Sequence, residues 1–128
     1  MADAYVLVNG NKAEINLPAD AQITVTAKTN SRLPQKVALT SQDGTVNHLF
    51  TGSGEANTVI GQATFTGASR LGATFEFSPS GSFSPSKLNS GGPYELGTYN
   101  VLLIVAENGD DSDYNDSILE FSWYTPKQ

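Results

Sequence analysis

The 128-residue sequence has no cysteine, a single histidine and no long hydrophobic run. Without cysteine the chain has no disulfide and no thiolate nucleophile or metal ligand, so its stability must come from its core or from bound ions. No window approaches the roughly 20 apolar residues of a transmembrane helix, which predicts no direct insertion into a membrane. The only histidine, His48, lies in a strand pattern and is interpreted as a strand surface residue, so no catalytic triad is expected.

Positive charge is also scarce. Seven lysines and arginines face 13 aspartates and glutamates, for a formal net charge of -6. Five of the acids fall within residues 107–116, and the remaining eight nearly balance the seven bases. The acidity is therefore local, and no basic patch is present to neutralise phosphates, which argues against a nucleic-acid partner.

The start of the sequence, residues 1–5, has neither a basic leader nor an apolar run, which predicts no signal peptide. We expect the protein either to accumulate in the cytoplasm or to be released by a route that needs no leader. The length predicts one domain over residues 1–128, since a chain of this size buries about two thirds of the surface that its unfolded form exposes.

Alternating apolar and polar residues recur in short segments separated by turn signals. Asn9-Gly10 and Asp43-Gly44 supply tight turns, and residues 22–29 alternate with the period of a half-buried strand. Residues 78–93 are rich in Ser, Gly and Pro and are interpreted as a long loop or an edge hairpin. This pattern predicts an all-β fold, an antiparallel, Greek-key-like β-sandwich. The predicted strands are residues 5–8, 12–17, 22–29, 36–40, 45–51, 58–66, 71–77, 94–106 and 117–124.

The acidic stretch, residues 107–116, contains five carboxylates and two carboxamides and no positive charge. Its donors are oxygen only, which favours a hard cation such as calcium over zinc or copper. An EF-hand is excluded, because Asp116 stands where that loop needs glycine and Ser122 stands where it needs glutamate. The residues predicted to wrap one or two calcium ions are Glu107, Asp111, Asp113, Asn115 and Asp116.

The acidic residues and the aromatic residues near them also have other interpretations. A solvated acidic turn is the simplest alternative, but this stretch lies between the two most apolar predicted strands rather than at a terminus. A glycosidase pair is disfavoured, because a crowded loop of like acids offers no asymmetry to separate two pKa values. Tyr114 is interpreted as a packing anchor, and Trp123 as a core residue rather than a sugar-stacking platform.

The acidic stretch, followed by an apolar strand ending in Trp123, closely resembles the calcium loop of the Pseudomonas-type fucose-binding lectin II family. A second match is the run Leu17-Pro18-Ala19-Asp20, followed by an alternating strand that ends at Asn30. Together the two segments cover about a quarter of the chain.

This resemblance implies a nine-stranded β-sandwich that holds two neighbouring calcium ions. In the family, vicinal hydroxyls of fucose or mannose complete the coordination of both ions, and no chemistry is performed on the sugar. The implied calcium ligands are Asn30, Glu107, Asp111, Asp113, Asn115 and Asp116. The implied sugar contacts are Ser31, Arg32, Asn108, Asp111, Asp113 and Asp116.

Two features distinguish this chain from its relatives. The segment that tunes sugar choice is Ser31-Arg32-Leu33, in which serine goes with fucose preference while the other two side chains are larger than usual. They either add contacts, obstruct the site or form an ordinary turn. Relatives end in a glycine whose carboxylate ligates the partner's calcium, whereas this chain runs two residues past the equivalent Pro126. A backbone carbonyl, the carboxylate of Gln128 or water would then have to take that place.

The sequence therefore predicts a calcium-dependent lectin without catalysis. The expected partners are fucose- or mannose-containing glycans, and the expected assembly is a homodimer or a higher homo-oligomer. The main alternative is a calcium-stabilised structural or adhesive β-sandwich that has lost sugar binding. A carboxylate-based hydrolase is the other rival.

Overall fold

The computed structural model describes residues 4–66, 70–107 and 116–125. Within them every regular element is a β-strand and every pairing is antiparallel, so the predicted all-β fold is confirmed. No helix long and apolar enough to cross a membrane occurs among the described residues. The nine strands are β1 (Tyr5–Asn9), β2 (Lys12–Asn16), β3 (Gln22–Ser41), β4 (Asn47–Thr66), β5 (Leu71–Phe77), β6 (Ser84–Pro85), β7 (Lys87–Leu96), β8 (Tyr99–Glu107) and β9 (Ser117–Tyr124).

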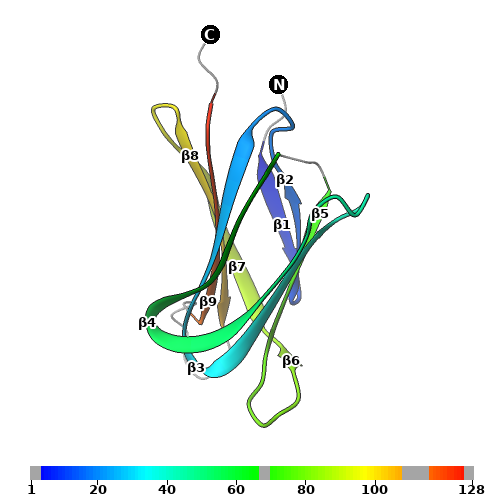
Figure 1. The fold of residues 1–128 in the computed structure, drawn as a ribbon, viewed down its shortest axis with the longest axis vertical. Helices are drawn as coiled ribbons and strands as arrows, with labels where there is room; N and C mark the ends of the chain where they lie inside the picture. Colours follow the sequence, from blue (N-terminus) through cyan, green and yellow to red (C-terminus); the bar gives the residue numbers. More distant parts are fainter. Residues whose placement is uncertain (1–3, 67–69, 108–115, 126–128) are drawn as a thin grey trace.

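The two longest strands, β3 and β4, join the two layers of the fold. The hydrogen-bonded order is β1-β2-β5-β3-β9-β8-β7, with β4 paired to β3 and β6 paired to β5. The first part of β3, residues 24–29, pairs with β9, and its last part, residues 35–41, pairs with β5. Figure 1 shows β3 and β4 running together as long curved strands, so that one pair of strands contributes to both layers.

The continuity of β3 and β4 differs from the prediction, which placed a loop at residues 30–34 and a turn at residues 52–54. The structure keeps both strands paired through these positions by shifts of register between Thr29 and Ser31 and between Ser31 and Gln35. Extra residues of this kind bend a strand and increase its twist. The turn residues therefore bend the pair from one layer to the other instead of ending it.

The prediction also placed the boundaries between strand and loop incorrectly in residues 78–106. The single strand predicted for residues 94–106 is a hairpin of β7 and β8, in which Gly97 has a φ of +66° at the turn. The predicted loop at residues 78–93 contains β6 and most of β7. The glycine and proline residues of this segment made β7 difficult to predict. They lower strand propensity but do not prevent an edge strand.

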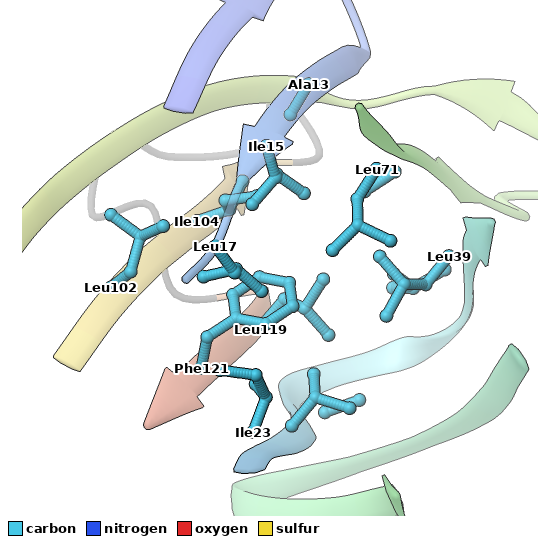
Figure 2. Packing of buried hydrophobic residues seen from close by; sticks show 14 of the residues in the cluster. Ala13, Ile15, Leu17, Ile23, Leu39, Leu71, Leu102, Ile104, Leu119 and Phe121 are labelled. Carbon is cyan, nitrogen blue, oxygen red and sulfur yellow. The ribbon is translucent and has the colours of Figure 1, made fainter. Parts of the chain in front are cut away.

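Apolar side chains from both layers meet in the core. Figure 2 shows Ile15 of β2, Leu39 of β3, Leu71 of β5 and Phe121 of β9 converging on the space between the layers. All four are at most 1% exposed, and burying each such side chain stabilises the fold by about 1.5–3 kcal/mol. Trp123 is 5% exposed within the same cluster, which confirms its predicted place in the core.

The two halves of β4 pack against each other where the strand curves. The ring of Phe50 lies against Gly61, where a Cβ atom would overlap it. The ring of His48 stacks on Phe50 with centroids 6.0 Å apart and lies 6.4 Å from Phe65. His48 is thus in a strand, as predicted, but it is half-buried in an aromatic group rather than a plain surface residue.

Gly61→Ala is expected to lower the free energy of unfolding by about 1–3 kcal/mol, because its methyl group would displace the Phe50 ring from a packed position. Gly72→Ala in β5 is the matched control. The nearest atom to a Cβ there is the Thr40 carbonyl oxygen at 3.9 Å, so stability should stay constant or rise slightly. Urea unfolding of the three proteins measures the difference, and equal losses in both variants would rule out the packing explanation.

Candidate functional site

Three of the predicted ligands lie side by side at one end of a layer. The backbone N–H of Asn30 donates to the carbonyl oxygen of Asp116 at 3.2 Å, and the N–H of Asp116 donates to the carbonyl oxygen of Ala106 at 3.0 Å. These bonds extend the β3-β9-β8 ladder one residue beyond the pairs that Ser117 makes with Thr29 and Ala106. The long-range pairing of three strands therefore brings Asn30, Asp116 and Glu107 to the same end of the layer.

The two described carboxylates of this row are buried. Glu107 is 3% exposed and Asp116 is 4% exposed, and both make polar interactions within the protein. Burying a carboxylate is unfavourable unless hydrogen bonds or a cation compensate for the lost water. For these two residues, the burial weighs against a simple solvated acidic turn.

The backbone of Asp116 is held by a fully buried threonine. The hydroxyl of Thr29 donates to the Asp116 carbonyl oxygen at 2.6 Å, and its oxygen accepts the N–H of Ser31 at 3.2 Å. Thr29 therefore links the start of β9 to the segment predicted to select the sugar. The role of Thr29 was not predicted from the sequence, because a threonine in a strand is ordinarily explained by strand propensity alone.

The side chain of Asn30 is positioned by β4. Its Oδ1 accepts the backbone N–H of Asn57 at 2.5 Å, and its Nδ2 donates to Asn57 Oδ1 at 3.5 Å. Ala56 and Asn57 have φ values of +63° and +61°, a left-handed conformation that asparagine tolerates better than most residues. This local distortion of β4 aims the Asn57 amide at Asn30. No pattern in the sequence was strong enough to predict this role of Asn57.

The predicted sugar-selecting segment has one buried and one exposed polar side chain. Ser31 is 6% exposed, and its Oγ accepts the N–H of Leu33 at 3.1 Å, which shapes a tight turn. The side chain of Arg32 is 86% exposed and its Nε lies 3.6 Å from Oε1 of Glu55 on β4. An ion pair this exposed contributes little to stability. The side chains of Arg32 and Glu55 therefore lie at the surface, and Glu55 was not among the predicted residues.

The other predicted site residues lie outside the described residues. These are Asn108, Asp111, Asp113 and Asn115, together with the C-terminal Pro126 and Gln128. Among residues 4–66, 70–107 and 116–125 alone, no three histidine, cysteine, aspartate or glutamate side chains are placed to hold a metal. The donors that this part of the chain does bring together are carboxylate and amide oxygens, which fit calcium and suit thiophilic metals poorly.

The family model of fucose-binding lectin II (PA-IIL) matches residues 15–125, which include every described residue of this row. The chain belongs to the fucose-binding lectin II family. The match extends over the middle of the sequence, between the two segments that carry the resemblance. No curated protein sequence matches the chain.

Solved lectin structures share the fold over nearly the whole chain. The high-affinity mannose-binding lectin of Ralstonia solanacearum is 27% identical, with a TM-score of 0.70 over 94% of this chain and 100% of its own. The Chromobacterium violaceum lectin CV2L in complex with α-methyl-fucoside is 24% identical, with a TM-score of 0.69 over 94% of this chain and 100% of its own. The C-terminal domain of the BC2L-C lectin from Burkholderia cenocepacia is 24% identical, with a TM-score of 0.68 over 95% of this chain and 100% of its own.

Membership of the fucose-binding lectin II family makes this chain a carbohydrate-binding lectin and not an enzyme. The hydrolase considered from the sequence is therefore set aside. The described residues agree with a binding role, since the row of Asn30, Asp116 and Glu107 offers oxygen donors held by the backbone.

Proposed function

We propose that this lectin binds fucose- or mannose-type monosaccharides through two calcium ions held at the end of the β3-β9-β8 layer. The observation that carries the proposal is the row of Asn30, Asp116 and Glu107, in which the strand pairing brings Asn30 to the two ends of the acidic stretch. The row joins the two sequence segments on which the ligand set depends. These segments are distant in the chain and neighbours in the fold.

The proposed ligand set matches the charge of two calcium ions. Its four carboxylates balance two divalent cations, and its two asparagines add neutral oxygen donors. When bound, the ions would supply the attraction for neighbouring sugar hydroxyls. The protein's part is to hold the donors at a fixed spacing and to orient the sugar. The full set is Asn30, Glu107, Asp111, Asp113, Asn115 and Asp116.

The proposed sugar contacts come from two segments of the chain. Asn108, Asp111, Asp113 and Asp116 belong to the acidic stretch, and Arg32 belongs to β3, where it pairs with Glu55. Ser31 acts from below the surface, where its hydroxyl shapes the turn. One solved relative is named for mannose and another was solved with α-methyl-fucoside, so both sugars are the appropriate ligands to test.

The alternative is a calcium-stabilised structural or adhesive β-sandwich without a working sugar site. One observation favours it. Arg32, one of the two side chains that are larger than the family resemblance implies, forms a charged pair with Glu55. In that case calcium binds and stabilises the fold while the pair blocks the sugar.

Isothermal titration calorimetry separates these functions. We expect methyl α-fucoside or methyl α-mannoside to release binding heat in the presence of calcium and none when a chelator is added. Calcium binding with no heat from either sugar would support the structural alternative. Sugar binding of equal strength in the chelator would contradict the ion-mediated site.

Of the two predicted assemblies, a homodimer or a higher homo-oligomer, we propose a homodimer formed through the outer face of the β7-β8-β9 layer. In β8 the outward positions Tyr99, Val101, Leu103 and Val105 are all apolar or aromatic and only half-buried. A sheet face exposed to water normally carries polar residues at such positions. Neighbouring strands extend this apolar face with Leu96, Tyr124 and Tyr94, which are 70%, 67% and 54% exposed.

A second copy of the chain is the occupant that this face fits. The ion pair of Lys28 and Glu120, 3.5 Å apart, places both charge signs on strands of the same layer, so two copies related by a twofold axis present complementary charges. Pairing would also join two sugar sites in one particle. Weak single-site binding gains from such simultaneous engagement.

A further inference from the structure

One buried glutamine lies under the candidate site without being one of its predicted residues. Gln35 is fully buried in β3, in the same inward alternation as Val37 and Leu39. Its Nε2 donates to the Leu33 carbonyl oxygen at 3.0 Å, and its Oε1 accepts the hydroxyl of Ser117 at 2.7 Å. One side chain therefore bridges the sugar-selecting segment and the start of β9.

These bonds continue into a closed circuit. Ser117 is covalently joined to Asp116, whose carbonyl oxygen accepts the hydroxyl of Thr29 at 2.6 Å. Thr29 in turn accepts the N–H of Ser31, and Ser31 accepts the N–H of Leu33. We call this circuit the buried clasp. Its members in order are Gln35, Leu33, Ser31, Thr29, Asp116 and Ser117.

Glutamine is suited to its place in the clasp because its amide donates and accepts at the same time. An ionised glutamate would turn an acceptor toward the Leu33 carbonyl oxygen, and methionine would leave both partners without a bond. A buried polar group that loses its partner cannot exchange it for water. The positions of Leu33 and Ser117 are therefore tied to each other through Gln35.

We infer that Gln35 is a positioning residue that sets the distance between the ion-binding and sugar-contacting parts of the site. The inference rests on the proposed function. Asp116, at one side of the clasp, belongs to the proposed calcium ligands, and the turn of Ser31 and Leu33, at the other side, carries Arg32. Because the clasp is closed, displacement of one side requires displacement of the other. Asp116, a proposed calcium ligand, would thus be held at a fixed distance from the sugar-contacting turn.

Gln35→Met tests the inference, with Asn100→Leu as the matched control. Asn100 is another buried amide, 4% exposed, that donates to the Trp123 carbonyl oxygen at 3.3 Å and to Thr125 Oγ1 at 2.8 Å. It lies at the opposite end of β8 from Ala106. Both variants lose buried hydrogen bonds and should melt at lower temperature than the wild type. Only Gln35→Met is expected to lose affinity for methyl α-fucoside or methyl α-mannoside at saturating calcium, by about tenfold.

Calorimetry on the full chain, well below both melting temperatures, distinguishes positioning from stability. Equal sugar affinities in wild type, Gln35→Met and Asn100→Leu would overturn the inference. So would equal losses in the two variants. If Gln35→Met does not fold, Ser117→Ala removes one bond of the clasp and should still weaken sugar binding while Asn100→Leu does not.

Failure of the proposed function has a different signature. If the wild type binds calcium but no sugar, the proposed sugar site is wrong. The role of Gln35 is then tested by calcium titration, in which Gln35→Met should lose affinity for the ion and Asn100→Leu should not. If the wild type binds neither calcium nor sugar, both proposals are wrong. If the wild type binds both and Gln35→Met matches it, only the clasp is wrong.

Discussion

Asp116→Asn is expected to lower both calcium affinity and calcium-dependent sugar affinity by about 100-fold, equivalent to about 2.7 kcal/mol. The substitution keeps the shape of the side chain and removes one negative charge from the proposed ion site. The backbone bonds of Asp116 to Thr29, Asn30 and Ala106 do not involve its carboxylate, so the end of the layer should remain intact. Titration of calcium, then of sugar, measures the two losses.

Asp43→Asn is the charge-matched control for this variant. Asp43 follows the end of β3, where hydrogen bonds from the hydroxyl of Ser41 and from the N–H and hydroxyl of Thr45 lower its pKa to about 2. It is therefore ionised at neutral pH, and its replacement removes the same charge away from the proposed site. Calcium should raise the melting temperature of wild type and Asp43→Asn but not of Asp116→Asn. Wild-type affinities in Asp116→Asn would contradict the ligand assignment.

Leu103→Glu is expected to convert the proposed homodimer into a folded monomer. Leu103 lies in the middle of the outer face of β8, so a charge there would be buried without a partner in the dimer but exposed to water in the monomer. Affinity for a single methyl glycoside should be unchanged. Binding to a glycan-coated surface should fall by about 100-fold, because the two sites no longer act together.

Analytical ultracentrifugation and surface binding measure these two effects. Thr40→Glu places the same charge on an exposed position of β3 in the other layer and should leave both unchanged. A wild-type protein that sediments as a monomer would refute the dimer. A dimer that persists in Leu103→Glu would show that copies meet through a different surface.

The local pattern of the sequence was sufficient for four of the strands that belong to one layer. The bounds of β5 and β9 were predicted as they are found, and those of β1 and β2 are correct within a residue. Each of these strands alternates regularly and ends at a turn signal. The prediction was wrong for β3 and β4, since Gly52, Gly54 and Pro34 resemble loop residues even where a paired strand bends through them.

The candidate site also contains residues that local sequence predicts and residues that only the fold identifies. Its carboxylates were apparent because five acids within ten residues are unusual in a chain that is otherwise nearly neutral. Glu55, Asn57 and Thr29 escaped notice, since each is ordinary in its own segment and gains its role from a neighbour on another strand. One feature of the sequence does indicate that Gln35 is unusual. It is a polar residue at an inward position of the alternation that continues through Val37 and Leu39.

By itself, the sequence determined the all-β fold, the local negative charge and the oxygen-only donors, because alternation and composition are properties of single segments. The tertiary structure alone decided that Asn30 of β3, Asp116 before β9 and Glu107 of β8 lie side by side in one row. It also decided that Gln35 connects the two sides of the site from beneath. Both depend on the register between strands far apart in the chain, and register is set by long-range hydrogen bonding and by burial of the shared core.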